Sequence, residues 1–141
     1  MIKAAGACIV AKDTKRILLQ QRSKDVSYPR NWGLFWRKVK EKENVSQGLF
    51  RELKEEINLD AISDIVKVHP LDQYHSRDKT FSYYTFVVIV EQEFIPQLNE
   101  ETGGYAWVHY DYFPKPLHPG TRRTLFSKSK LKLVKNIING L

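Results

Sequence analysis

Apolar residues along this chain follow two spacings, one typical of strands and one typical of a helix. Residues 4–11 and 16–22 are rich in apolar and β-branched side chains, and they flank a polar segment at 12–15. This arrangement predicts a hairpin near the N-terminus, with the polar segment as its turn. Further strands are predicted over residues 65–74, 80–93 and 105–109.

One helix is predicted over residues 45–58, because apolar side chains recur there at every fourth position. The recurring residues are Val45, Leu49, Leu53 and Ile57. Asn44 is placed to cap the first turn, with Gln47 three positions later as in a capping box. Asn58 is expected to end the helix, since asparagine tolerates the left-handed backbone conformation better than most residues.

The remaining segments are predicted as loops and a terminal helix. Residues 23–36 are rich in serine, proline, asparagine and glycine, and residues 113–120 are rich in proline, so both are predicted as loops. A final helix is predicted over residues 121–139, with a break at Ser127. The mixture of strands and helices predicts an α/β fold with a mixed sheet, in a single domain over residues 1–141.

Cysteine usage and the lengths of apolar runs indicate in which cellular compartment the protein is expected. Cys8 is the only cysteine and lies in an apolar stretch. It is interpreted as a core residue, with a catalytic thiol as the alternative. No apolar run reaches the length of a membrane span, and the N-terminus lacks the pattern of a secretion signal. We therefore expect a cytoplasmic protein that does not associate with membranes.

The formal net charge of +7 originates in the C-terminal part of the chain. Residues 112–141 contain seven lysine or arginine residues and no acid. Such a tail favours contact with nucleic acid or polyphosphate. An amphipathic helix that packs its apolar side and solvates its lysines explains the same pattern, and it is the preferred interpretation. The lysines expected to face solvent are Lys128, Lys132 and Lys135.

Glu52, Glu55 and Glu56 fall at positions i, i+3 and i+4 of the predicted helix, beside its apolar stripe. Like charges at contact distance repel by about 1 kcal/mol per pair in water unless a cation compensates them. Mg²⁺ prefers carboxylate oxygens and leaves positions open for water and phosphate. The alternative is a solvated charged face, since glutamate and lysine are common helix formers.

The residues around these acids resemble the signature of the Nudix hydrolase superfamily, G-x5-E-x7-R-E-U-x-E-E-x-G-U, where U is a bulky aliphatic residue. The matching positions are Glu43, Arg51, Glu52, Leu53, Glu55, Glu56 and Leu59. Upstream, Trp32 and Gly33 resemble the tryptophan-glycine pair that many members carry. The resemblance implies a MutT-like hydrolase with the Nudix α/β/α sandwich.

The chain departs from the signature where the family has a Gly-Gly loop. The two glycines fall on Trp36 and Arg37, Lys40 stands where an acid is common, and Asn58 replaces the last glycine. Glycine serves where the backbone needs positive φ, so Arg37 is expected to strain this loop by about 1–2 kcal/mol. Arg37 and Lys40 also add cations beside the acids, which is expected to weaken metal affinity.

The resemblance implies roles for the residues that match. The expected ligands of Mg²⁺ or Mn²⁺ are Glu52, Glu55, Glu56 and the backbone carbonyl of Arg37. Glu52 is the expected base that activates water, with a loop acid as the alternative. Arg51 is expected to orient the carboxylates through an ion pair with Glu43 or with a helix acid.

Contacts with substrate are predicted outside the helix. Arg22, at the end of the second strand, is expected to contact phosphate. A carboxylate from a late loop often joins the site in this family, which singles out Glu101 and its neighbour Glu100. Aromatic residues are candidates to stack on a base, although aromatics near a core usually only pack. These aromatic candidates are Trp32, Trp36 and Tyr28.

Two functions follow from these residues. The preferred one is Mg²⁺-dependent hydrolysis of the pyrophosphate bond of a nucleoside diphosphate derivative, because the helix acids, Arg51 and Glu43 are all present. The alternative is a Nudix fold with weakened catalysis that binds nucleotide or RNA, as Trp36, Arg37 and the basic tail indicate. The signature does not identify the substrate, and a homodimer is left open.

Overall fold

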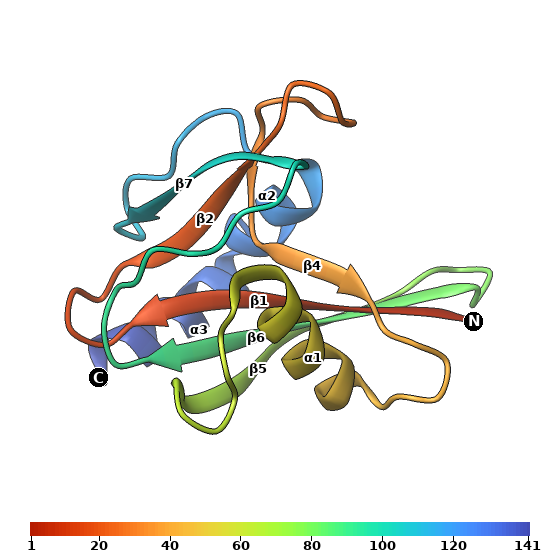
Figure 1. Ribbon diagram of the computed structural model, residues 1–141, viewed down its shortest axis with the longest axis horizontal. Helices are drawn as coiled ribbons and strands as arrows, with labels where there is room; N and C mark the ends of the chain where they lie inside the picture. Colours follow the sequence, from red (N-terminus) through yellow and green to blue (C-terminus); the bar gives the residue numbers. More distant parts are fainter.

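The computed structural model describes residues 1–141 as a seven-stranded mixed sheet with helices on both faces (Figure 1). The strands are β1 (Ile2–Ala11), β2 (Ile17–Arg22), β3 (Trp32–Gly33), β4 (Phe35–Lys38), β5 (Ile65–His75), β6 (Phe81–Val90) and β7 (Thr102–Val108). The helices are α1 (Val45–Ile57), α2 (Pro119–Leu125) and α3 (Lys128–Asn139). None of the three combines the length and the apolar character that a membrane crossing requires.

β1 organises the sheet because it pairs along both of its edges. It runs parallel to β6, with Ile2 opposite Phe81 and Ala11 opposite Val90. Its other edge is antiparallel to β4 near the start of the strand and to β2 near its end, which confirms the predicted hairpin. β5 extends the sheet beyond β6, and both β3 and β7 pair with β2.

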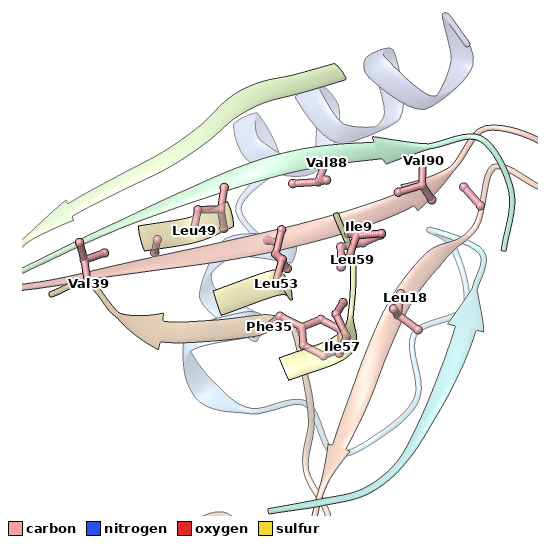
Figure 2. Close-up of a cluster of buried hydrophobic side chains, with 13 residues drawn as sticks. Ile9, Leu18, Phe35, Val39, Leu49, Leu53, Ile57, Leu59, Val88 and Val90 are labelled. Carbon is pink, nitrogen blue, oxygen red and sulfur yellow. The ribbon is translucent and has the colours of Figure 1, made fainter. Parts of the chain in front are cut away.

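α1 covers one face of the sheet with the apolar stripe that the sequence predicts. Leu49, Leu53 and Ile57 are buried in one cluster with Ile9 of β1 and Val88 of β6 (Figure 2). Each buried leucine or isoleucine side chain stabilises the fold by about 1.5–3 kcal/mol. The helix is therefore held firmly, and the acids beside the stripe lie at the rim of this face.

α3 covers the opposite face, so the predicted α/β/α sandwich is confirmed. Val134 and Ile138 of α3 are buried in a second cluster with Cys8 and Val10 of β1. Burial raises the pKa of the Cys8 thiol to about 12, which makes it an inert core group. Ser127 separates α2 from α3, and the predicted break at this residue is confirmed.

The ends of α1 follow the predicted signals. Asn44 Oδ1 accepts a hydrogen bond from the Gln47 N–H, and Gln47 Oε1 accepts one from the Asn44 N–H, both at 2.9 Å. This capping box satisfies donors that a helix start leaves open. Asn58 adopts φ 58° and ψ 35°, the left-handed conformation, and ends the helix as expected.

The prediction of one loop over residues 23–36 is wrong at its C-terminal end, where β3 and the start of β4 lie. Local composition favours a loop, whereas pairing with the distant strand β1 imposes an extended conformation on β4. Arg37 lies opposite Ala5 of β1 and has no positive φ, so the strain expected at this residue is also absent. Positive φ occurs earlier, at Tyr28 and Arg30.

Gly48 marks a close approach between α1 and the segment that follows β4. A Cβ atom at Gly48 would lie 2.8 Å from both Cγ atoms of Val39, a buried side chain that is stiff about χ1. Such crowding costs about 1–3 kcal/mol, against the roughly 1 kcal/mol that alanine gains over glycine in a helix. We therefore expect Gly48→Ala to lower the free energy of unfolding measured in urea.

The control for this prediction is the same substitution in a Val39→Ala background. Val39→Ala removes the two methyl groups that the new Cβ would meet. There Gly48→Ala should lower the free energy of unfolding less than it does with Val39 in place, because only the milder contact with the Cβ of residue 39, at 3.1 Å, opposes the gain in helix propensity. A stabilising effect of Gly48→Ala with Val39 in place would contradict the close packing.

Candidate active site

Arg51 holds three carboxylates together at the rim of α1. Its Nε and Nη2 bind the two oxygens of Glu43 at 2.7 and 2.9 Å, which makes a bidentate ion pair. Its Nη1 binds Glu52 Oε1 at 2.7 Å and Glu55 Oε2 at 3.1 Å. A planar guanidinium suits this geometry and fixes the orientation of the acids as well as neutralising them.

The loop before α1 presents Glu43 to Arg51. Glu43 Oε1 also accepts a hydrogen bond from the backbone N–H of Lys40 at 3.0 Å. The hydrogen bonds from Arg51 lower the pKa of Glu43 from 4.5 to about 2, and the same contacts raise the pKa of Arg51. Both members of the pair are therefore charged at neutral pH.

Removal of Arg51 should weaken the pH dependence of the free energy of unfolding in the acid range. Because the pKa of Glu43 is lower in the folded than in the unfolded chain, the pair stabilises the fold above pH 4.5, and this contribution disappears as the pH falls toward 2. In Arg51→Gln the pKa of Glu43 should return toward 4.5, which an NMR titration of its carboxyl carbon measures. A value that stays near 2 in the variant would contradict this assignment.

The third helix acid, Glu56, is bound by a different arginine. Arg37 of β4 donates from Nε and Nη2 to the two oxygens of Glu56, both at 3.1 Å. Asn99, in the loop before β7, donates to the same carboxylate through its side-chain amide. Arg37 Nη2 also lies 3.5 Å from a carboxylate oxygen of Glu101. A guanidinium thus saturates Glu56 from the position where the signature has glycine.

The helix acids suit a hard divalent cation in their chemistry, but arginines take their oxygens in this arrangement. The side chains of Glu52, Glu55 and Glu56 are 19, 57 and 24% exposed and offer carboxylate oxygens at one rim. No three histidine, cysteine, aspartate or glutamate side chains are grouped so that they could hold a metal ion. A cation that shares Glu56 with the other acids therefore requires Arg37 to leave.

A cleft of ≈ 700 Å³ lies on the other side of Arg37. Arg123 of α2 stacks over the ring of Tyr74, with its guanidinium carbon 4.2 Å from the ring centroid, and donates to the Tyr83 hydroxyl at 3.2 Å. The aromatic wall of this cleft consists of Trp36, Tyr74, Phe81 and Tyr83. An aromatic wall with a stacked cation suits a ligand that has both a planar ring and anionic groups.

The sequence identifies only Trp36 as a candidate among the groups of this wall. It predicts Tyr74, Phe81 and Tyr83 as strand residues and Arg123 as part of a basic tail. The pairing of β6 with β1 on one side and β5 on the other brings these groups together. The only local signal is the aromatic residues alternating along β6, which a core-facing strand also shows.

Of the predicted substrate contacts, Arg22 and Glu101 line the cleft, whereas Trp32 and Tyr28 do not. Arg22 is tied to the loop that follows it, because Nε donates to the Ser27 carbonyl at 2.6 Å and Nη2 to the Ser27 hydroxyl at 2.9 Å. Trp32 packs against the apolar cluster beneath α3. It is therefore placed to support the cleft and not to touch a ligand inside it.

The basic residues of the C-terminal part do not gather at the cleft. Arg123 is the one cation of this part that lines it. Lys128 and Lys132 are exposed, as expected. Lys135 faces solvent in part, because its side chain is 36% exposed and its Nζ lies 3.2 Å from Asp111. The charge of the tail is thus distributed over α2, α3 and the loop that precedes them.

Comparisons with known proteins agree with this architecture. A MutT Nudix hydrolase from Burkholderia pseudomallei is 26% identical, with a TM-score of 0.65 over 88% of this chain and 95% of that chain. The dihydroneopterin triphosphate pyrophosphohydrolase of E. coli is 22% identical, with a TM-score of 0.62 over 99% of this chain and 96% of that chain. A C. elegans Ap4A hydrolase is 20% identical, with a TM-score of 0.67 over 98% and 99%.

The sequence itself gives a second, independent comparison. No curated protein matches it at a significant level. The family model of the NUDIX domain, however, matches residues 2–127, which is most of the chain. This match contains α1 with its three acids, Arg51 and Glu43, together with the strands that position them. The chain therefore belongs to the NUDIX family of hydrolases.

Proposed function

We propose that this protein hydrolyses the pyrophosphate bond of a nucleoside diphosphate derivative with the help of Mg²⁺ or Mn²⁺. The observation that carries the proposal is the junction between the acid cluster and the cleft. Trp36 and Arg37 line the cleft, and they also line a narrow gap that reaches Glu52 and Glu56. A ligand with its ring in the cleft would extend its phosphates toward the acids.

The acids of α1 supply the charge and the base in this proposal. The assigned metal ligands are Glu52, Glu55, Glu56 and the backbone carbonyl of Arg37. When bound, the cation polarises a phosphoryl oxygen and makes a coordinated water more acidic. Arg51 binds Glu52 Oε1, which leaves Oε2 free either to hold the metal or to accept the proton of the attacking water, and in the first case a loop acid such as Glu101 takes the proton. Glu43 keeps Arg51 in this position through their bidentate pair.

The cleft supplies binding and orientation. We assign the aromatic wall to binding of the nucleobase and Arg22 to binding of a phosphate. Glu101 lies at the border between the cleft and the helix acids. Trp32 acts indirectly, because its carbonyl accepts a hydrogen bond from the His118 N–H at 2.8 Å and so holds His118 beside the cleft. The names of the similar E. coli and C. elegans structures, a triphosphate pyrophosphohydrolase and an Ap4A hydrolase, favour a phosphoanhydride substrate.

Release of phosphate or pyrophosphate from a panel of nucleotides, with and without Mg²⁺, tests the proposal. The panel should contain nucleoside triphosphates, dinucleoside polyphosphates, nucleotide sugars and capped RNA, because fold and signature do not choose between them. We expect turnover of at least one class, abolished by a chelator and restored by added metal. Nucleotide binding without turnover of any class would support the alternative of a catalytically weakened Nudix fold.

One observation favours that alternative, namely the guanidinium of Arg37 on Glu56. A site whose acid is saturated by an internal cation binds metal less readily and turns over more slowly. RNA as the ligand has less support, since Arg123 alone among the basic residues of the tail lines the cleft. Calorimetry of nucleotide and RNA binding in the absence of metal separates the two ligands.

A further inference from the structure

Arg37 lies on the boundary between the acid cluster and the cleft. On one side its Nε and Nη2 bind Glu56 at 3.1 Å, and on the other Nη2 lies 3.5 Å from Glu101. Its Nη1 donates to the carbonyl of Trp36 at 2.9 Å. The side chain is 29% exposed and is itself part of the lining of the cleft. A ligand in the cleft can therefore reach the same guanidinium that binds Glu56.

A metal ion on Glu56 and the guanidinium of Arg37 exclude each other in this arrangement. Both carboxylate oxygens of Glu56 receive hydrogen bonds from Arg37, and one of them also receives a hydrogen bond from Asn99. Two cations held on one carboxylate repel strongly. Binding of a metal ion to Glu56 therefore includes the free energy of displacing Arg37.

The cleft offers Arg37 a replacement partner of another kind. Three arginines line it, and Glu101 is the only carboxylate among its lining residues, so its charge favours anions. A guanidinium binds a phosphate oxygen pair in the same bidentate manner as a carboxylate. A phosphate group at this border can take the place of Glu56 without loss of hydrogen bonds to Arg37. The arginines concerned are Arg22, Arg37 and Arg123.

We propose that Arg37 exchanges partners as the site fills: it binds Glu56 in the free protein and transfers to a phosphate group of the ligand, which releases Glu56 for the divalent cation. This inference rests on the proposed function and adds a substrate-binding residue to it. Each ligand then assists the other, because the anion removes the cation that competes with the metal. Arg37, which departs from the family signature, thereby couples the two binding events.

A mutant cycle with Mn²⁺ alone as the probe tests the first half of the exchange. The dissociation constant of Mn²⁺ is measured by calorimetry for the wild type, Arg37→Ala, Glu56→Gln and the double variant. Arg37→Ala should bind Mn²⁺ at least about tenfold more tightly. Glu56→Gln should change the wild-type affinity less than about threefold, since Arg37 already occupies Glu56, but it should abolish the gain in Arg37→Ala.

Sulfate tests the second half, because it is a tetrahedral oxyanion that binds Mn²⁺ only weakly in water. At constant ionic strength, sulfate in place of chloride should tighten Mn²⁺ binding by the wild type and leave Arg37→Ala unchanged. Arg16→Ala is the matched control, since Arg16 also makes a bidentate pair with a glutamate, Glu93, but lines neither the cleft nor the gap that reaches Glu56. It should bind Mn²⁺ with the affinity of the wild type in chloride.

The outcomes separate this inference from the function on which it rests. If Mn²⁺ binding depends on Glu52 but is equal in the wild type and Arg37→Ala, or if sulfate acts equally on both, the exchange is overturned and the metal site stands. If no variant binds Mn²⁺, the proposed function fails and the exchange fails with it. Should Arg37→Ala not fold, as judged by circular dichroism, Arg37→Lys replaces it and should show a smaller gain of the same sign.

Discussion

Replacement of Glu52 by glutamine is expected to lower kcat by about three orders of magnitude while the fold is retained. The amide oxygen can still accept the hydrogen bond from Arg51, but the side chain no longer takes up a proton or contributes a charge. Loss of a positioned general base typically costs about 10²–10⁴ in rate. Steady-state turnover of the nucleotide that is cleaved measures the effect, and thermal unfolding verifies the fold.

Glu41→Gln serves as the control for this substitution. Glu41 is an exposed acid in the turn before α1, so its change removes the same charge without altering the site. It should leave kcat unchanged. Full activity of Glu52→Gln would exclude Glu52 as the base, and the role would then move to an acid of the late loop such as Glu101.

Arg51→Ala should produce the largest loss of stability at the site, roughly 1–2 kcal/mol at pH 7 without metal. The substitution removes hydrogen bonds to Glu43, Glu52 and Glu55 and leaves these like charges side by side. The figure stays at the low end for charged hydrogen bonds because the cluster is partly solvated. Mg²⁺ should restore part of the loss, which urea unfolding with and without the metal measures.

Arg16→Ala is a matched control for the geometry of this ion pair. Arg16 binds Glu93 through Nε and Nη2 at 2.6 and 2.8 Å, but its side chain is 45% exposed. Exposed pairs of this kind contribute little to stability because solvent screens them, so the loss should be smaller than for Arg51→Ala, and Mg²⁺ should not rescue the variant. Equal losses and an equal response to Mg²⁺ in the two variants would contradict the special role of Arg51.

The parts of the molecule that the sequence predicts well depend on neighbours within a few positions. The capping box at Asn44, the apolar stripe through Leu53 and the left-handed Asn58 each involve residues no more than four apart, and all three are present in the structure. The facing of Glu55 toward Arg51 follows from the same helical periodicity, because the two residues are four positions apart. The family resemblance then supplied the fold, which the structure confirms.

The parts that it misses depend on pairing between distant strands. The loop-like composition around Trp36 gives no indication that β4 pairs with β1. This pairing determines the backbone conformation of Arg37. The same holds for the cleft, where Tyr74 of β5 and Arg123 of α2 come together only in the finished sheet. From the sequence, Arg37 is only a cation at a position where the signature has glycine. Its bidentate contact with Glu56 becomes visible only in three dimensions.

β1 occupies the centre of the sheet, yet its parallel partner β6 follows about eighty residues later in the chain. At synthesis rates of roughly 5–20 residues per second, β1 leaves the ribosome about 4–16 s before β6 is complete. During this interval β2 is available to it, while one full edge of an apolar strand stays open to other nascent chains. We therefore expect the yield of folded protein in a cell to depend on the elongation rate and on chaperones that shield extended apolar segments.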